Sequence, residues 1–156
     1  MNPVIRKATQ ADAQAMAPKL RRADYEELMH STGGKKPVEA LIDSIEASEA
    51  SWAVEYKGHA VAIYGIGEHK VHPNVGVPWL LSTDELDVIW KPFLKGSREV
   101  IELFSEWYPV LTNAVDINHT KAQAWLEWLG FEPDISFPVG EYHQPFILYI
   151  RCPTNV

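Results

Sequence analysis

The sequence predicts an α/β fold (α+β with a mixed sheet), in which helices cover both faces of the sheet. Three observations support this prediction: strand and helix patterns alternate in the order β-α-α-α-β-β-β-α-β-α-β-β, 46% of the residues are apolar, and no linker divides the chain. Strands joined by a tight turn pair antiparallel, whereas strands joined through a helix tend to pair parallel, so one sheet holds both kinds of pair. The 156 residues are expected to form a single domain, residues 1–156.

The first part of the chain is predicted to be a short strand followed by three helices. Thr9 follows the strand and is a residue type that caps helix N-termini. Pro18 breaks the helical spacing that comes next, so that stretch is interpreted as two helices. The predicted elements are a strand at Pro3–Lys7, two helices within Ala11–His30 with the second near Pro18–Met29, and a helix at Pro37–Ser48.

A hairpin is the clearest local signal in the middle of the chain. Gly58 separates two β-rich runs and supplies the positive φ that a tight turn needs. The next strand is too continuously apolar for an exposed edge, and a long stretch with a helical apolar stripe follows it. The predicted elements are strands at Ser51–Tyr56, Ala60–Ile66 and Asn74–Thr83, and a mostly helical stretch at Asp84–Tyr108.

The last part of the chain is predicted to be a strand, a helix and two final strands. Gly130 follows the helical spacing directly, in the position where glycine commonly ends a helix. The predicted elements are a strand at Val110–Val115, a helix at Thr120–Leu129, and strands at Phe131–Ile135 and Gln144–Arg151 that form a hairpin.

Charge and cysteine content narrow the classes of function. A formal charge of −7 argues against a general nucleic-acid-binding protein, because phosphate contacts need a basic surface. The single cysteine, Cys152, allows no internal disulfide, which is typical of a reducing compartment. No signal peptide is recognised at the N-terminus and no apolar run is long enough to span a bilayer, so we expect a cytoplasmic protein.

The closing strand–helix–strand block resembles a known family. From Val115 the chain continues through Asn118 into a helix rich in small and aromatic residues, which ends at Gly130-Phe131. Together with the order of elements, this block resembles the GNAT superfamily of N-acetyltransferases. The plainer alternative is that many helix–strand junctions end in glycine followed by an apolar residue.

A narrower resemblance extends from about Ala60 to Tyr149. An apolar strand ends in Ser82-Thr83-Asp84, a long helix follows, Tyr108-Pro109 opens the next strand, and a helix closes at Trp125–Gly130. These features resemble small podophage proteins of the "internal virion protein A" type. The resemblance implies a phage-encoded protein, located in the host cytoplasm or in the virion.

The GNAT resemblance implies acetyl-CoA as the cofactor. In that family, backbone amides after the fourth strand bind the pyrophosphate at a helix N-terminus, and the strand separates from its neighbour so that pantetheine pairs with it. The family's glycine-rich loop is absent after Leu81, and the nearest substitute is Lys95-Gly96-Ser97-Arg98. A competing interpretation makes Gly96 a helix kink or the start of a second helix, with Ser97 as its N-cap. The predicted cofactor-binding residues are Leu81, Ser82, Lys95, Gly96, Ser97, Arg98 and Asn118.

Glu68 and His72 are the predicted catalytic residues, because they follow the third strand near the expected position of a base. The alternative is that both are exposed loop residues. No metal site is predicted, since the nearby histidines lack enough further ligands. Counting back from Gly130, the family's usual tyrosine acid is replaced by Leu126, and nothing in the sequence places Tyr108 or Tyr142 near a thiolate.

Two classes of function follow from these features. The first is an acetyl-CoA-dependent N-acyltransferase, supported by the order of elements and the closing block. The second is a non-catalytic GNAT-like protein that binds a phage particle or a host protein, supported by the missing glycine-rich loop and tyrosine. Its partner is accordingly an acyl-CoA or another protein. The sequence leaves open the acyl acceptor and whether the chain forms a homo-oligomer.

Overall fold

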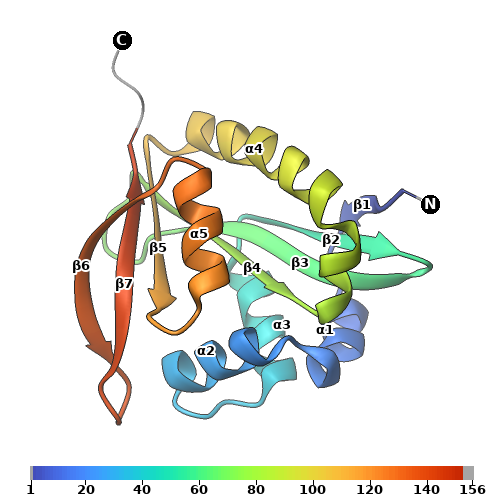
Figure 1. Ribbon diagram of the computed structural model, residues 1–156, viewed down its shortest axis with the longest axis horizontal. Helices are drawn as coiled ribbons and strands as arrows, with labels where there is room; N and C mark the ends of the chain where they lie inside the picture. The colour runs from blue at the N-terminus through green and yellow to red at the C-terminus, as the bar shows by residue number, and fades with distance from the viewer. Residues whose placement is uncertain (1, 153–156) are drawn as a thin grey trace.

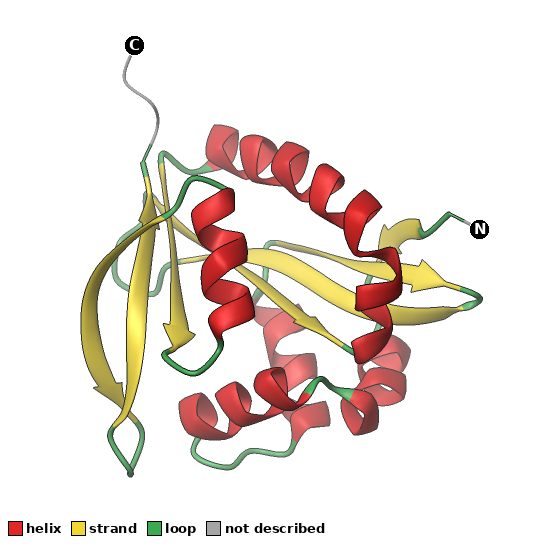
Figure 2. Ribbon diagram, in the orientation of Figure 1, coloured by secondary structure: helices red, strands yellow, loops and turns green. Residues whose placement is uncertain are grey.

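The computed structural model describes residues 2–152 and contains one seven-stranded mixed sheet (Figures 1 and 2). The strands lie in the order β1-β2-β3-β4-β5-β7-β6, and β4 and β5 are the parallel pair. The strands are β1 (Val4–Lys7), β2 (Ala50–Tyr56), β3 (His59–Glu68), β4 (Val75–Ser82), β5 (Val110–Asp116), β6 (Glu132–Val139) and β7 (Gln144–Arg151). The predicted α/β fold and its order of elements are confirmed.

Helices cover both faces of this sheet. Helices α1, α2 and α3 lie on one face, where Met16 and Leu41 join the core with β3 residues such as Ile63. Helices α4 and α5 lie on the other face, where Phe104 and Leu126 pack together. The helices are α1 (Gln10–Met16), α2 (Arg22–Thr32), α3 (Pro37–Ala47), α4 (Trp90–Trp107) and α5 (Thr120–Trp128), with 3₁₀ turns at Ala17–Lys19 and Asp84–Ile89. None of the helices in residues 2–152 combines the length and apolar character needed to cross a membrane.

Local sequence signals explain several of the boundaries. Thr9 caps α1 as predicted, in a capping box with Asp12. Pro37 occupies the first turn of α3, where its missing N–H has no cost. Lys57 and Gly58 both have positive φ, which matches the type I′ turn that a two-residue hairpin loop requires.

The helix after β4 differs from the prediction in one respect that matters for the site. A 3₁₀ turn covers Asp84–Ile89, and α4 then continues without interruption from Trp90 to Trp107. Gly96 therefore does not start a second helix, and Ser97 is not an N-cap: its hydroxyl donates to the Leu94 carbonyl at 2.7 Å. The apolar stripe of α4 outweighs the weak helix propensity of one glycine.

Strand β3 is longer than predicted because its glycines allow a close approach of the neighbouring chain and do not end the strand. A Cβ on Gly65 would lie 2.7 Å from the Ala50 carbonyl oxygen on β2, so a side chain has no room there. The strand continues through Gly65 and Gly67 to Glu68, where the prediction ends it at Ile66.

Gly65→Ala and Gly96→Ala should change stability in opposite directions. The first forces a backbone oxygen to move and is expected to lower the free energy of unfolding by about 1–3 kcal/mol. The second adds a methyl group where no atom lies within 4 Å, and its better helix propensity should raise stability by up to about 1 kcal/mol. Urea denaturation followed by circular dichroism measures both, and equal signs for the two variants would contradict this account.

Candidate active site

Strands β4 and β5 separate soon after they meet. Their parallel pairing is confined to Val75 with Val110 and Gly76 with Leu111, and beyond Gly76 the two strands diverge (Figure 1). The Asn113 side chain of β5 spans the gap, donating from Nδ2 to the Pro78 carbonyl oxygen at 2.6 Å. The opening leaves one edge of β4 without a strand partner in the middle of the sheet.

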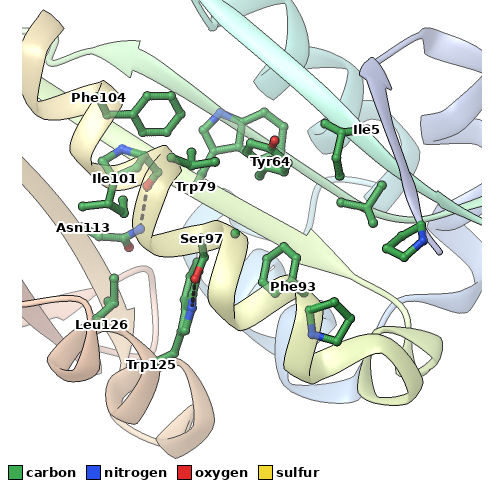
Figure 3. Close-up of a pocket in the computed structure, with 16 residues that line it drawn as sticks. Ile5, Tyr64, Trp79, Phe93, Ser97, Ile101, Phe104, Asn113, Trp125 and Leu126 are labelled. Carbon is green, nitrogen blue, oxygen red and sulfur yellow. Dashed lines mark hydrogen bonds between the residues drawn. The ribbon is translucent and has the colours of Figure 1, made fainter.

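Two pockets meet at this opening and share Asn113, Trp125 and Leu126. The polar one, here named the split pocket, lies between α2 and α5 and includes Arg21, Asp24, Glu27, His119 and Lys121. The apolar one, here named the α4 cavity, encloses about 180 Å³ under the inner face of α4 (Figure 3). The α4 residues that line this cavity are Pro92, Phe93, Gly96, Ser97, Val100, Ile101 and Phe104.

Asp24 is the centre of a buried polar network in the split pocket. Its carboxylate is only 2% exposed and accepts hydrogen bonds from Arg21 Nε at 3.1 Å, from the Ser82 N–H at 2.9 Å and from His119 Nε2 at 2.7 Å. Burial opposes ionisation, but the hydrogen bonds and the Arg21 charge outweigh it and hold the Asp24 pKa below its usual range. A buried carboxylate with this many partners is stably ionised and fixes α2, β4 and α5 to one another.

His119 is held in one orientation. Its Nδ1 accepts a hydrogen bond from the Ala122 N–H at 3.3 Å and so caps α5, which leaves Nε2 to donate to Asp24. Both ring nitrogens are therefore occupied by protein partners. His119 positions the network and the start of α5.

Glu27 differs from its neighbours because its carboxyl group is not matched by a cation. The Asp116 N–H donates to Glu27 Oε2 at 3.0 Å. Burial raises the pKa of Glu27 to about 7, and the Asp116 hydrogen bond opposes this only in part. A partly buried carboxyl group with such a pKa, at the edge of a polar pocket, is suited to accept a proton near neutral pH.

The start of the helical segment after β4 is acidic. Asp84, Glu85 and Asp87 lie in the first turn, and the Thr83 side chain already caps it by accepting from the Glu85 N–H. Glu85 pairs with His59 and Asp87 pairs with Lys121, so within residues 2–152 Asp84 is the carboxylate here without an ion-pair partner. Its charge favours the positive end of the turn and opposes a second anion there. The opening beside β4 thus fits an extended uncharged arm such as pantetheine, whereas the helix start does not fit a pyrophosphate.

The predicted phosphate-binding segment does not lie at the start of a helix. Residues 95–98 are inside α4, so their backbone N–H groups bond within the helix and are not available to a phosphate. The Arg98 guanidinium lies 3.9 Å from the centre of the Trp128 ring and donates to the Trp128 carbonyl oxygen. We therefore correct the prediction that backbone amides around Gly96 bind a phosphate, because an unbroken helix uses these amides in its own hydrogen bonds.

The structure brings only part of the remaining predicted cofactor set to the opening. Ser82 is buried at the end of β4 and bonds to Asp24. Leu81 is buried in the core against the α1–α3 face. Asn118 is exposed in the turn before α5, where its N–H donates to Asp116 Oδ1.

The predicted catalytic residues Glu68 and His72 lie away from both pockets. Glu68 pairs with Gly76 at the closed end of the β4–β5 opening, and His72 is exposed in the loop that follows. Neither lines the split pocket or the α4 cavity. Within residues 2–152 no group of three or more His, Cys, Asp or Glu residues is arranged to hold a metal ion.

Leu126 lies in the opening, where the resemblance places the tyrosine acid, and lines both pockets. Tyr108 is at the closed end, where its hydroxyl donates to Glu49, and this bond and burial raise its pKa to about 12. Tyr142 is 84% exposed. Neither of these two tyrosines lines a pocket.

Asp24, Glu27, Asn113 and His119 are the site residues that sequence reasoning missed. One signal was available: Asp24 and Glu27 are three residues apart in a predicted helix and share a face with apolar Leu28. Carboxylates on the inner face of a helix indicate a functional or paired position. For His119 the resemblance offered a second signal, because counting back from Gly130 puts the family's usual asparagine at His119, or at Asn118 if one residue is inserted. No comparable signal marks Asn113.

Solved structures of acetyltransferases superpose on almost the whole chain. A ribosomal-protein-alanine N-acetyltransferase from Brucella melitensis has 15% identity and a TM-score of 0.68, with 96% of this chain and 99% of that chain covered. An acetyltransferase of the GNAT family from Streptococcus pneumoniae has 17% identity and a TM-score of 0.65, with 97% and 100% covered. An aminoglycoside acetyltransferase in complex with coenzyme A has 15% identity and a TM-score of 0.66, with 97% and 95% covered.

These likenesses establish that the chain has the GNAT acetyltransferase fold. No family profile and no curated protein sequence matches the chain. The fold resemblance expected from the closing block is confirmed, while the structures compared above do not show a phage origin.

Glu27→Gln should change how stability depends on pH. The folded pKa of Glu27, about 7, lies above its ordinary value of 4.5, so native Glu27 binds a proton that the unfolded chain releases. The stabilisation from this proton is therefore present below pH 4.5 and is lost as the pH rises through 7. The variant should therefore match the wild type at low pH and exceed its free energy of unfolding by about 2 kcal/mol at pH 8, after allowance for partial exposure.

Urea titrations between pH 4.5 and 8 measure this difference. Glu26→Gln is the matched control, since Glu26 lies on the exposed side of α2 and pairs with Arg22 at the surface. The control should follow the wild type within about 0.5 kcal/mol throughout. Parallel pH profiles for the two variants would contradict the position assigned to Glu27.

Proposed function

We propose that the protein is an N-acyltransferase that takes an acyl group from a coenzyme A thioester, with acetyl-CoA as the simplest donor. The observation that carries the proposal is Glu27, whose raised pKa places a proton acceptor at the edge of a pocket that leads into the β4–β5 opening. The GNAT fold supports the reaction class, since acetyltransferases share it.

Each residue of the split pocket has a defined role in this proposal. An acceptor amine enters from the α2 side, attacks the thioester carbonyl, and gives its proton to Glu27 as the C–N bond forms and the C–S bond breaks. Asp24, Arg21 and His119 hold the walls of the pocket. Leu126 offers no proton to the departing sulfur, but a thiol has a pKa of about 8.5, so the thiolate is a sufficiently good leaving group to be protonated by water.

Acetyl-CoA binding and Glu27→Gln test the proposal together. Calorimetry should detect acetyl-CoA binding, and release of the CoA thiol should follow when a panel of primary amines is added. The variant keeps an oxygen that accepts from the Asp116 N–H, so it should bind acetyl-CoA normally while kcat falls about 100-fold or more. The wild-type kcat/KM should rise with pH up to about 7 and then level off. Absence of binding at millimolar acetyl-CoA would refute the proposal.

Acetyl-CoA affinity also tests the effect of the acidic start of the helical segment. Asp84→Asn removes one exposed charge from the expected pyrophosphate position and should tighten acetyl-CoA binding about two- to fivefold at low salt, with less effect at high salt. Asp134→Asn, the same change on the exposed strand β6, is the control and should have no effect. Equal affinities for both variants would show that the pyrophosphate lies elsewhere.

A second candidate function is favoured by the same acidic turn and by Leu126. We propose, as the alternative, a phage-encoded protein that uses the GNAT scaffold without catalysis and binds the phage particle or a host protein. The sequence resemblance to podophage internal virion proteins supports it, and so do Trp107 and Trp128, which are 41% and 39% exposed. Mass spectrometry of purified particles of a phage that encodes the chain tests the particle-bound form, which absence from them would exclude.

A further inference from the structure

The α4 cavity is a feature of the molecule that the proposed reaction leaves unused. It begins at the β4–β5 opening, where Pro78 and Asn113 line it, and continues under α4 toward Phe93 (Figure 3). A donor thioester placed in the opening would therefore have its acyl carbon beside the mouth of an apolar space.

Three of the polar side chains in the cavity wall are already engaged by protein partners. Asn113 donates to the Pro78 carbonyl, Ser97 donates to the Leu94 carbonyl, and Trp125 Nε1 donates to Ser97 Oγ at 3.2 Å. Val54, Phe104 and Leu126 are among the apolar side chains that complete the wall. A ligand that enters the cavity gains contact area and little hydrogen bonding, which is the environment that a hydrocarbon prefers.

The size of the cavity indicates a chain longer than acetyl. An apolar cavity of roughly 150 Å³ is enough to hold benzene, and the α4 cavity encloses about 180 Å³. An acetyl methyl group would leave most of this volume empty, whereas a straight chain of roughly six to eight carbons would occupy it.

The charge at the start of the helical segment leads to the same conclusion. The Asp84 charge and the Thr83 cap oppose the favourable pyrophosphate contact that a helix start can supply. Binding of the donor then depends on its uncharged portions, and the cavity is the place where an acyl chain adds affinity.

We propose that the α4 cavity binds the hydrocarbon chain of a medium-length acyl group, so that the donor is a hexanoyl or octanoyl thioester in preference to acetyl-CoA. This inference rests on the proposed acyltransferase function for the thioester, while the cavity itself accepts the chain whether or not coenzyme A is attached. The chain extends from the opening beside Asn113, along the inner face of α4 and past Gly96.

Gly96 provides the test. It lines the cavity, and a Cβ built on it meets no atom within 4 Å outside its own helical turn. We expect a larger side chain at this position to extend into the cavity. Calorimetry with acetyl-, hexanoyl- and octanoyl-CoA, and with sodium octanoate, should show affinity rising about fourfold for each added methylene until the cavity is full. Gly96→Leu should remove this gain, lowering octanoyl-CoA affinity at least tenfold and changing acetyl-CoA affinity less than twofold.

Matched variants separate filling of the cavity from other effects. Gly96→Ala improves helix propensity with little filling and should retain most of the chain-length gain, and Glu99→Leu adds the same leucine on the exposed side of α4 and should retain all of it. Thermal unfolding confirms that each variant is folded. Val100→Phe, which fills the same cavity from another position, replaces Gly96→Leu if that variant does not fold.

The outcomes distinguish this inference from the proposed function. Equal binding of acetyl-CoA and octanoyl-CoA overturns the cavity inference and leaves the acyltransferase proposal intact. Octanoate binding that Gly96→Leu abolishes, without binding of any CoA ester, supports the cavity as a hydrocarbon site and refutes the acyltransferase. Failure of every ligand to bind overturns both.

Discussion

The separation of β4 from β5 after Gly76 is the constraint on which the rest of the molecule depends. Backbone groups in the middle of a sheet need partners when no strand lies beside them. Pro78 has no N–H to satisfy, its carbonyl accepts from Asn113, and the Ser82 N–H donates to Asp24. Side chains from β5 and α2 thus replace strand pairing, and the opening remains in a sheet that is otherwise continuous.

The opening also requires a buried charge, the Asp24 carboxylate, because this group accepts the hydrogen bond of the Ser82 N–H. Asp24 bonds to β4 only as an acceptor, and its ionised form is stabilised by Arg21 and His119. Removing one member of such a network would leave the others buried without partners, which costs more than the network contributes in the intact protein. Glu27, one turn further along α2, has no cation of its own and takes a pKa near 7. The two carboxylates therefore differ in role because only one of them is paired.

The two ends of the opening differ in a way that bears on the donor. The end at Asp84 is acidic and already capped by Thr83, whereas the α4 cavity is apolar, and Ser97 and Trp125 in its wall are bonded to protein. In the proposed function a donor would be held less by its phosphates than by its uncharged portions. A GNAT fold without the usual glycine-rich loop would then keep a site for an acyl group, with selectivity that depends on chain length.

The sequence by itself determined the order of elements, the capped helix starts and the hairpin turn, because capping, turn chemistry and hydrophobic periodicity are local. The GNAT resemblance, counted back from Gly130, put Leu126 where the usual tyrosine stands, and the structure has Leu126 at the opening. The tertiary structure decided the site. Gly96 was the nearest substitute for the family's glycine-rich loop but lies inside α4, while Asp24, Asn113 and His119 come from three separate elements and meet only when the sheet forms. Partners 95 residues apart, such as Asp24 and His119, leave no pattern in a single sequence, because only the folded sheet determines which distant side chains are buried together.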